Sequence, residues 1–268
     1  MEHARTVLPE SAPAHTVPPG GPDVETSREV MGLRFWDTPL ERAARYLVDA
    51  AVAGTRVQAY FVNAHCINVA ARDPGYSRLL REANCLFADG AGMALAARLT
   101  GTALENNVNG TDLFPHLCAA AAAASVPLAF LGARPGVARQ CADITERAHP
   151  GLRIVWVEDG YLSKESETAR LAELNGSGAR LLLVAKGVPM QEHWIAENAP
   201  RLAAPVVMGV GALFDFYSGT VPRAPKLVRK ARMEWAFRLA QEPRRLFSRY
   251  VLGNPAFVAR ALLWRLSH

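Results

Sequence analysis

Asp89 and Asn63 each follow a short apolar run, which predicts that both lie at the ends of strands. Asp89 comes after the run that begins at Cys85, and Asn63 comes after the run from 56 to 62. A carboxylate at a strand end that faces a cleft can act as a general base, and Asn63 can lie beside it. Both residues also fit a purely structural role, since Asp and Asn are favoured at turns and helix N-caps.

Gln191 and Glu192 form a second candidate, because Pro189 opens a helix and puts both residues in its first turn. Side chains and free backbone N–H groups can bind a polar ligand there, although acidic first turns also simply complement the helix dipole. A third candidate contains Asp215, which can bind a sugar hydroxyl. Glycines after expected strands let backbone amides approach a phosphate or a sugar, and they are Gly132, Gly160, Gly187, Gly209 and Gly211.

No metal or cofactor motif is present. The seven histidines have no HxH or HExxH spacing, and there is no DxD, the paired carboxylates that often hold a metal in sugar-nucleotide enzymes. The chain also lacks GxGxxG and GxxxxGK[ST], so the main sequence evidence for a dinucleotide-dependent oxidoreductase or an NTPase is absent. We therefore expect chemistry without a metal or cofactor. Four widely spaced cysteines are expected to be buried free thiols in a reducing cytoplasm: Cys66, Cys85, Cys118 and Cys141.

Apolar runs alternate with helical segments along most of the chain, which predicts a parallel sheet with helices on both faces. Strands are expected at 56–62, 85–88, 127–131, 152–157, 180–185 and 205–210. Helices are expected at 39–53, 78–83, 92–99, 110–124, 135–148, 165–174 and 189–198. The fold class is therefore α/β, a Rossmann-like and mostly parallel sheet. Ligands bind at the carboxyl ends of the strands in such folds, where the candidate residues lie.

Composition divides the 268 residues into three parts. Residues 1–28 are Pro-rich and without a signal peptide, and we expect a disordered tail. Residues 29–220 form the α/β core, and residues 221–268 a basic helical appendage. The appendage has eleven basic residues against two acidic ones, a net charge of +9, which leaves 19 against 23 and −4 for the rest. No stretch indicates a membrane span.

Aromatic residues and arginines interleave in the appendage, for example Trp235 and Phe237 with Arg238. Such a segment can lie on an anionic membrane surface or offer arginines to a diphosphate. It can also be a helix pair docked on the body with a solvated basic face, or a nucleic-acid-binding element. The residues alone favour the solvated face.

The run from Asn63 to Tyr250 resembles the WecG/TagA/CpsF family of bacterial glycosyltransferases over about two thirds of the chain. The motifs that carry the resemblance stand in order: Asn63-Ala64, Asp89-Gly90-Ala91-Gly92, Val108-Asn109-Gly110-Thr111-Asp112, Phe130-Leu131-Gly132-Ala133, Gly160-Tyr161, Gly187 to Glu192, Gly209-Val210-Gly211, Asp215, Gly219, Arg223-Ala224-Pro225, Glu234-Trp235, Arg238-Leu239 and Glu242-Pro243-Arg244-Arg245.

The resemblance implies an inverting, metal-independent transfer from a UDP-sugar to a polyprenyl-diphosphate-linked sugar, at the cytoplasmic face of the membrane. The sugar is of the N-acetylmannosamine, glucose or hexuronate type, and the product enters a cell-surface polysaccharide. Asp89 matches the family's proposed general base, and Asn63 and Gln191 match polar residues of its pocket. Donor contacts are expected at Gly132, Gly160, Tyr161, Gly187, Gln191, Glu192, Gly209, Gly211 and Asp215. Contacts to the acceptor, a diphosphate or the membrane are expected at Arg223, Arg238, Arg244, Arg245 and Arg249. Homo-oligomers occur in the family.

Three positions depart from the family pattern. Many members have Arg where Asn107 stands, a hydroxyl residue where Phe61 stands and Gly where Arg232 stands. Arg98 or an arginine of the appendage can compensate for Asn107. Two other functions remain open: a nucleic-acid-binding protein that uses the basic appendage, and an inactive scaffold docked at the membrane. The body has no RNP, KH or helix-turn-helix pattern, so no nucleic-acid partner is expected.

Overall fold

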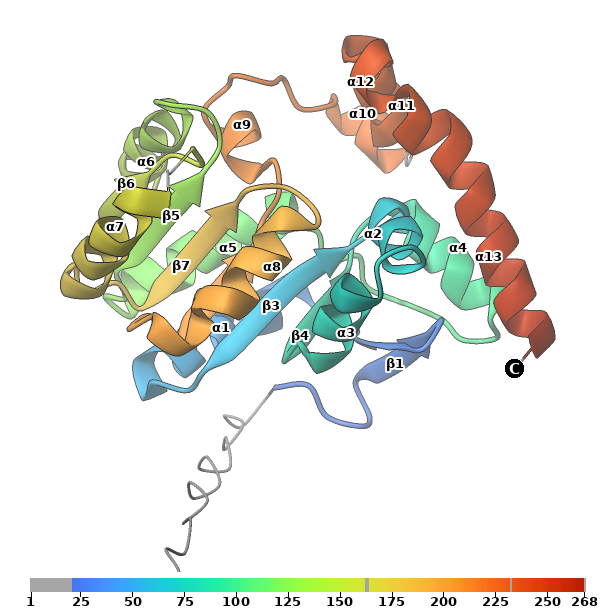
Figure 1. The fold of residues 1–268 in the computed structure, drawn as a ribbon, viewed down its shortest axis with the longest axis horizontal. Coiled ribbons are helices and arrows are strands. Elements are labelled where there is room, and N and C mark those ends of the chain that lie inside the picture. The colour runs from blue at the N-terminus through green and yellow to red at the C-terminus, as the bar shows by residue number, and fades with distance from the viewer. Residues whose placement is uncertain (1–20, 162–163, 232, 268) are drawn as a thin grey trace, which may run out of the picture.

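A six-stranded parallel sheet forms the centre of the protein in the computed structural model, which describes residues 21–161, 164–231 and 233–267. The strand order is β4-β3-β8-β7-β5-β6 (Figure 1). The strands are β3 (Val57–Val62), β4 (Cys85–Ala88), β5 (Leu128–Gly132), β6 (Ile154–Glu158), β7 (Leu181–Ala185) and β8 (Val206–Gly209). Each expected strand is present, and the predicted Rossmann-like α/β class is confirmed.

Helices cover both faces of the sheet because both faces of the strands are apolar. In β3, Ala59 and Phe61 belong to one hydrophobic core, and Tyr60 and Val62 belong to the other. Such two-sided burial is typical of parallel sheets. The first core is covered by α1 (Leu40–Ala53), α5 (Gly110–Ala123), α6 (Val137–Ala148) and α9 (Leu213–Tyr217). The second is covered by α2 (Ala64–Ala70), α3 (Pro74–Glu82), α4 (Ala91–Leu99), α7 (Lys164–Gly176) and α8 (Met190–Asn198), which η1 (Ala199–Arg201) extends.

An antiparallel hairpin that the sequence did not predict precedes α1. Its strands are β1 (Ser27–Val30) and β2 (Leu33–Trp36), paired from Ser27 with Trp36 to Val30 with Leu33. Ser27 and Arg28, which the composition placed in the tail, belong to β1. Residues 1–20 of the predicted tail lie outside the described part of the chain.

The C-terminal appendage is helical, as predicted. It contains α10 (Lys226–Lys230), α11 (Glu234–Gln241), α12 (Pro243–Phe247), a π-helical turn η2 (Ser248–Leu252) and α13 (Gly253–Ser267). Figure 1 shows it leaving α9 through a loop, passing over the upper edge of the body and descending beside α4. Arg232, at which the chain departs from the family pattern, lies outside the described residues.

The last helix holds the far end of the appendage on the body. Phe257 and Ala261 of α13 are buried in the second core. Asn68 of α2 donates to the Gly253 carbonyl at 2.7 Å and accepts from Arg260 Nε at 3.2 Å. In the described residues, no helix is long and apolar enough to span a membrane.

Candidate active site

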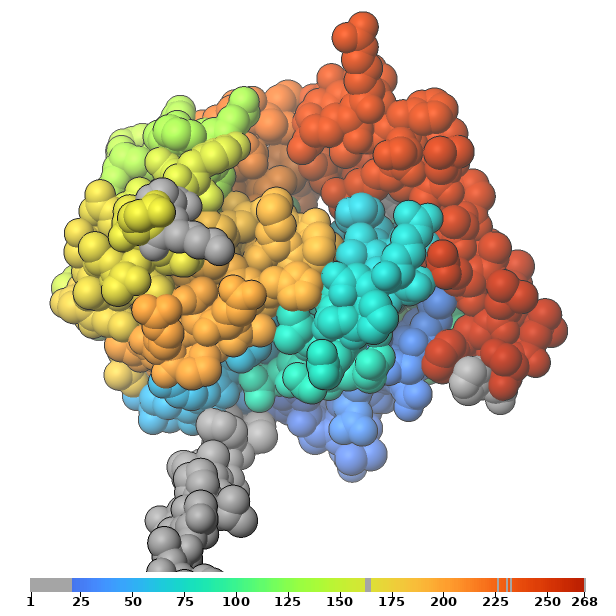
Figure 2. All heavy atoms as spheres, in the orientation of Figure 1, coloured from blue at the N-terminus to red at the C-terminus, as the bar shows by residue number. Residues whose placement is uncertain are grey.

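A cavity of about 800 Å³ lies at the carboxyl ends of β3, β4, β7 and β8, under the appendage. Its walls come from the body and from α10 to α13 together. Figure 2 shows the surface hollowed where the red C-terminal helices meet the cyan and orange parts of the body. The prediction that the strand ends form the site agrees with this position, which is where open α/β sheets bind ligands.

Asp89 and Asn63 meet in this cavity because they end neighbouring strands. Asn63 is the N-cap of α2, and its Oδ1 accepts from the backbone amides of His65 and Cys66 at 3.0 and 3.3 Å. Those bonds fix the side chain so that Nδ2 donates to Asp89 Oδ2 at 3.2 Å. The capping role and the role beside the carboxylate are therefore both present in one residue.

Asp89 carries a perturbed carboxyl group. Burial raises its pKa above the usual range, while the hydrogen bond from Asn63 and the charges of Arg249 and Arg238 act in the opposite direction. A carboxylate whose pKa is moved toward neutrality, yet held by a donor and by cations, has the properties of a general base. Asn107 holds the next residue in place, since its Oδ1 accepts from the Gly90 amide at 2.6 Å.

Gln191 lies at the bottom of the cavity, only 2% exposed. Its Oε1 accepts from the Gly211 amide at 2.9 Å, and its Nε2 donates to Glu192 Oε1 at 2.8 Å. Glu192 is fully buried behind it, and burial raises its pKa to about 7. A Cβ on Gly209 would lie 3.0 Å from Gln191 Nε2, so glycine is needed for this packing. The expected residues Gln191, Gly187, Gly209 and Gly211 line the cavity, whereas Glu192 supports it from behind.

Three of the five expected arginines line the cavity: Arg238, Arg245 and Arg249. The Nε atoms of Arg238 and Arg249 are buried and have no hydrogen-bond partner among the described residues. Arg223 binds Asp112 and Glu234 instead, and Arg244 is exposed on α12 outside the cavity lining.

Besides Glu192, four of the expected donor residues do not line the cavity. Gly132 is the last residue of β5, where an added Cβ would overlap the Ala185 carbonyl, so close packing of two strands explains this glycine. Gly160 follows β6, and its carbonyl accepts from Lys186 Nζ at 2.9 Å. Tyr161 is 72% exposed. Asp215 lies 3.9 Å from Arg134 in an ion pair on the other half of the sheet edge.

Several cavity residues were not among the expected site residues. Glu234 of α11 is half-buried, burial raises its pKa, and Asp89 is among the charges that act on it. His65 lines the cavity with a pKa of about 4, lowered by burial and by Arg249, so it is neutral at physiological pH. Phe61, one of the departures, lines the wall and stacks on Phe87 at 5.4 Å. The Glu234-Trp235 pair was visible as a motif, but its position facing Asp89 depends on how the appendage folds back.

The cysteines form no disulfide among the described residues. All four cysteines are free and buried, as predicted, and burial raises their pKa, that of Cys66 to about 12. Within the described ranges, no group of three or more His, Cys, Asp or Glu side chains is arranged to hold a metal ion.

Comparisons with known proteins agree with the resemblance seen in the motifs. The model of the "Glycosyl transferase WecG/TagA/CpsF family" matches residues 28–268. A relative from Bacillus spizizenii (strain ATCC 23059 / NRRL B-14472 / W23) is 31% identical over 193 residues, which cover 72% of this chain and 74% of the relative. That relative is named N-acetylglucosaminyldiphosphoundecaprenol N-acetyl-beta-D-mannosaminyltransferase.

Proposed function

The chain belongs to the WecG/TagA/CpsF family of glycosyl transferases, and from this membership and the cavity we propose an inverting transfer from a UDP-sugar to a polyprenyl-diphosphate-linked sugar. The name of the Bacillus spizizenii relative supports an N-acetylmannosamine-type donor and a lipid-linked acceptor. Glucose and hexuronate remain the other donors to be tested. The observation that carries the proposal is Asp89, hydrogen-bonded to Asn63 in a cavity that Arg229, Arg238, Arg245 and Arg249 line.

The proposed reaction is a single displacement. The Asp89 carboxylate takes the proton of an acceptor hydroxyl as the hydroxyl oxygen forms a bond to the anomeric carbon. The bond between that carbon and the diphosphate oxygen breaks, and its electron pair leaves with UDP. Attack from the face opposite the leaving group inverts the anomeric centre. Asn63 donates to the carboxylate throughout and keeps it oriented toward the acceptor.

Arg238, Arg245 and Arg249 are proposed to bind the diphosphate, with no metal or separate cofactor. Guanidinium groups form strong charge-assisted hydrogen bonds with phosphate oxygens. Charge grows on the leaving diphosphate in the transition state, so donors already placed in a partly dry cavity contribute more than they would in water. The guanidinium groups of Arg238 and Arg249, whose side chains line the cavity, supply donors of this kind.

The exposed face of the appendage supports peripheral binding to the cytoplasmic face of the membrane, where a lipid-linked acceptor would lie. Apolar side chains there are at least half exposed at Phe247, Leu252, Leu263 and Leu266, and the last of these reaches 84%. Arg244 of α12 is also exposed. Apolar residues that enter the interface beside cations are typical of peripheral membrane segments.

The test is a donor screen with a polyprenyl-diphosphate-linked sugar, read by mass spectrometry of the lipid product. We expect transfer from one UDP-sugar and a loss of roughly 10²–10⁴-fold for Asp89→Asn, the usual effect of removing a general base. Asp143→Asn, on the exposed surface of α6, is the matched control and should keep full activity. Transfer by Asp89→Asn at the wild-type rate would exclude this mechanism. Vesicle binding without any transfer would instead favour a scaffold, and salt-sensitive DNA or RNA binding a nucleic-acid protein.

A further inference from the structure

The middle of the appendage has little apolar contact with the body. Among the described side chains of α10, α11 and α12, only Leu246 is buried. By contrast, α13 buries Phe257 and Ala261 and hydrogen-bonds α2. Something other than hydrophobic burial must hold the middle segment over the cavity, because so little apolar area is removed from water there.

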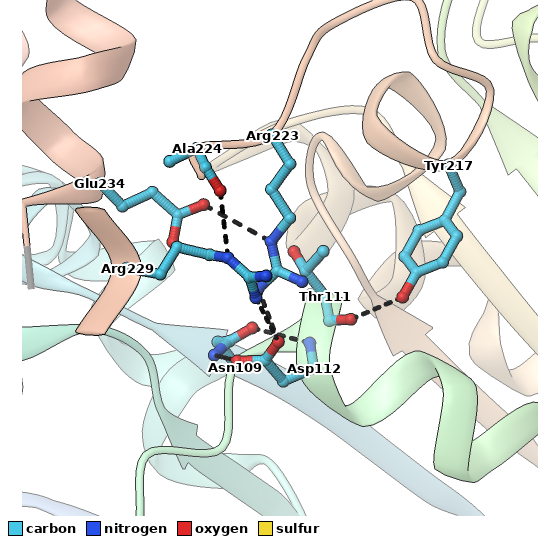
Figure 3. A network of polar contacts seen from close by, with 8 residues as sticks. All are labelled: Asn109, Thr111, Asp112, Tyr217, Arg223, Ala224, Arg229 and Glu234. Carbon is cyan, nitrogen blue, oxygen red and sulfur yellow. Dashed lines mark hydrogen bonds and ion pairs between the residues drawn. The ribbon is translucent and has the colours of Figure 1, made fainter. Parts of the chain in front are cut away.

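A polar cluster joins this segment to the N-terminus of α5 (Figure 3). Arg223 Nη2 donates to Asp112 Oδ1 at 2.6 Å, and Arg229 Nη1 lies 3.6 Å from the same oxygen. Glu234 Oε1 lies 3.7 Å from Arg223 Nε. We call these four residues, Asp112, Arg223, Arg229 and Glu234, the clasp. Arg229 Nε also donates to the Ala224 carbonyl at 3.1 Å, which connects the two arginines to each other.

Asp112 is set in place before it meets the arginines. Its backbone amide donates to the N-cap Asn109 Oδ1 at 2.8 Å, and its Oδ2 accepts from Asn109 Nδ2 at 2.7 Å. Its Oδ1 is therefore the oxygen directed to the appendage. Burial acts to raise the pKa of Asp112, but the hydrogen bonds from Asn109 and Arg223 and the charges of Arg223 and Arg229 hold it below the usual range. The carboxyl group is charged at physiological pH.

The clasp lies at the edge of the cavity. Asn109, Gly110 and Thr111 line the cavity on the body side, and Arg229 and Glu234 line it on the appendage side. Tyr217 fixes the same turn, since its hydroxyl donates to the Thr111 carbonyl at 2.9 Å. The carboxylate that begins α5 therefore connects the wall near Asp89 to the helices that bring Arg238, Arg245 and Arg249.

We propose that Asp112 is a positioning residue: by binding Arg223 and Arg229, it holds α10 to α12 and the adjoining turn η2 in the arrangement in which Arg238, Arg245 and Arg249 line the cavity. The role of those arginines rests on the proposed function, but the clasp itself does not. Asp112 contacts no reacting atom of the proposed transfer, and it acts through the placement of the appendage.

Hydrogen–deuterium exchange of the full chain tests the clasp without any sugar substrate. Asp112→Asn keeps the backbone amide that bonds Asn109 and loses the charge. We expect exchange in α10 to α12 to rise roughly tenfold, the effect of removing one charged hydrogen bond from a local opening equilibrium, with α6 unchanged. Asp143→Asn, which removes a 3.7 Å ion pair with Arg139 on α6, is the control and should leave the appendage unchanged.

Arg223→Gln removes the same contact from the other side, so misfolding of one variant does not end the test. If both residues act through one clasp, the effect of the double variant on exchange will be smaller than the product of the two single effects. Exchange within twofold of wild type in both single variants would overturn the proposal. So would a double variant whose effect is the product of the two single effects.

A binding measurement with UDP separates positioning from general stability. We expect the Kd for UDP to rise roughly tenfold in Asp112→Asn while the melting temperature of the body stays near wild type, because the arginines that contact the diphosphate are displaced. A faster-exchanging appendage together with unchanged UDP binding would overturn the positioning role. Failure of the wild type to bind UDP would count against the proposed function and leave the exchange result intact.

Discussion

Asn63→Asp separates the two roles of Asn63. Asp is as good an N-cap as Asn, so an oxygen still accepts from the amides of His65 and Cys66 and α2 is preserved. In wild type, Asn63 Nδ2 donates to Asp89 Oδ2 at 3.2 Å. In the variant, a carboxylate oxygen that accepts hydrogen bonds and carries negative charge takes the place of this donor. The ionised form of Asp89 therefore loses a hydrogen bond and gains a repulsive neighbour, and both changes raise its pKa further.

The magnitude follows from these two terms. A hydrogen bond to a charged group contributes about 1.5–3 kcal/mol, which corresponds to roughly 10- to 150-fold in the ionised fraction at a pH below the pKa. Two carboxylates at about 4 Å repel by about 4 kcal/mol at an effective dielectric constant of about 20, which is an upper value for the second term. We therefore expect kcat/KM at acidic pH to fall between about 10-fold and the roughly 10⁴-fold expected when the base itself is removed.

The assay is sugar transfer measured from about pH 5 to pH 9, the range over which general-base profiles are usually resolved. Because the raised pKa leaves Asp89 protonated to a higher pH, the acid limb of the profile should move upward and activity should recover in part at high pH. Asp73→Asn is the control, since it exchanges the N-cap of α3 outside the cavity and should not move the profile.

An unchanged acid limb in a folded Asn63→Asp protein would refute the assignment of Asp89 as a base oriented by Asn63. Asn63→Asp can instead lose activity by the same factor at every pH and melt at a lower temperature than Asp73→Asn. That result would mean that Asn63 only caps α2.

Three further outcomes are expected. Glu192→Gln should change the pH dependence of stability, because burial raises the folded-state pKa of Glu192 to about 7 and the folded wild type therefore binds the proton more tightly than the unfolded chain. As pH rises from about 4.5 to about 7, the free energy of unfolding of wild type should fall by up to about 3 kcal/mol relative to that of the variant. Urea unfolding at a series of pH values measures this difference. A constant difference between the two proteins across that range would contradict the burial of a titrating carboxyl. Gly132→Ala should destabilise the protein by about 1–3 kcal/mol or more in thermal melts, because its Cβ would overlap the Ala185 carbonyl and its φ is +131°. Gly176→Ala in α7 is the control: open space surrounds this position, so the variant should be as stable as wild type or more stable. Transfer should persist in excess EDTA, since arginines are proposed to carry the diphosphate charge; loss of activity that Mg²⁺ or Mn²⁺ restores would contradict this.

The sheet was predictable because its strands are short, mainly apolar runs that end in or are followed by glycine or a polar residue. The run from Leu181 to Ala185 is buried at every position. The hairpin before α1 was not predictable from the same signals. Its strands alternate weakly, and its turn is Met31-Gly32, both with positive φ, in place of the Asn-Gly pair that usually marks such turns. Contacts of the hairpin with β4 and α4, which are remote in sequence, stabilise it.

Only part of the candidate site was predictable, because the sequence gives the order of the strands along the chain but not their order in the sheet. Sequence order places Asp89, Gly132 and Gly160 at the ends of successive strands, and each is an equally good candidate on that basis. The spatial order β4-β3-β8-β7-β5-β6 puts the first beside Asn63 and the other two at the far end of the sheet. The appendage raised the same difficulty, since neither the strand pattern nor the charge count indicates that Glu234 turns back toward Asp89.

The net charge of +9 on the appendage is compatible with an external polyanion, but the structure assigns most of the described cations to contacts within the protein or to the cavity. Arg223 and Arg229 bind Asp112. Arg238, Arg245 and Arg249 line the cavity, while Arg260 and Arg265 bond Asn68 and the Leu99 carbonyl. A guanidinium that is held by a carboxylate or directed into a cavity adds little to the electric field outside the protein. The basic residues of the appendage therefore serve mainly to bind it to the body and to line the cavity. The exposed leucines and Phe247, more than the charge, are then the features of the appendage that support the proposed binding to a membrane.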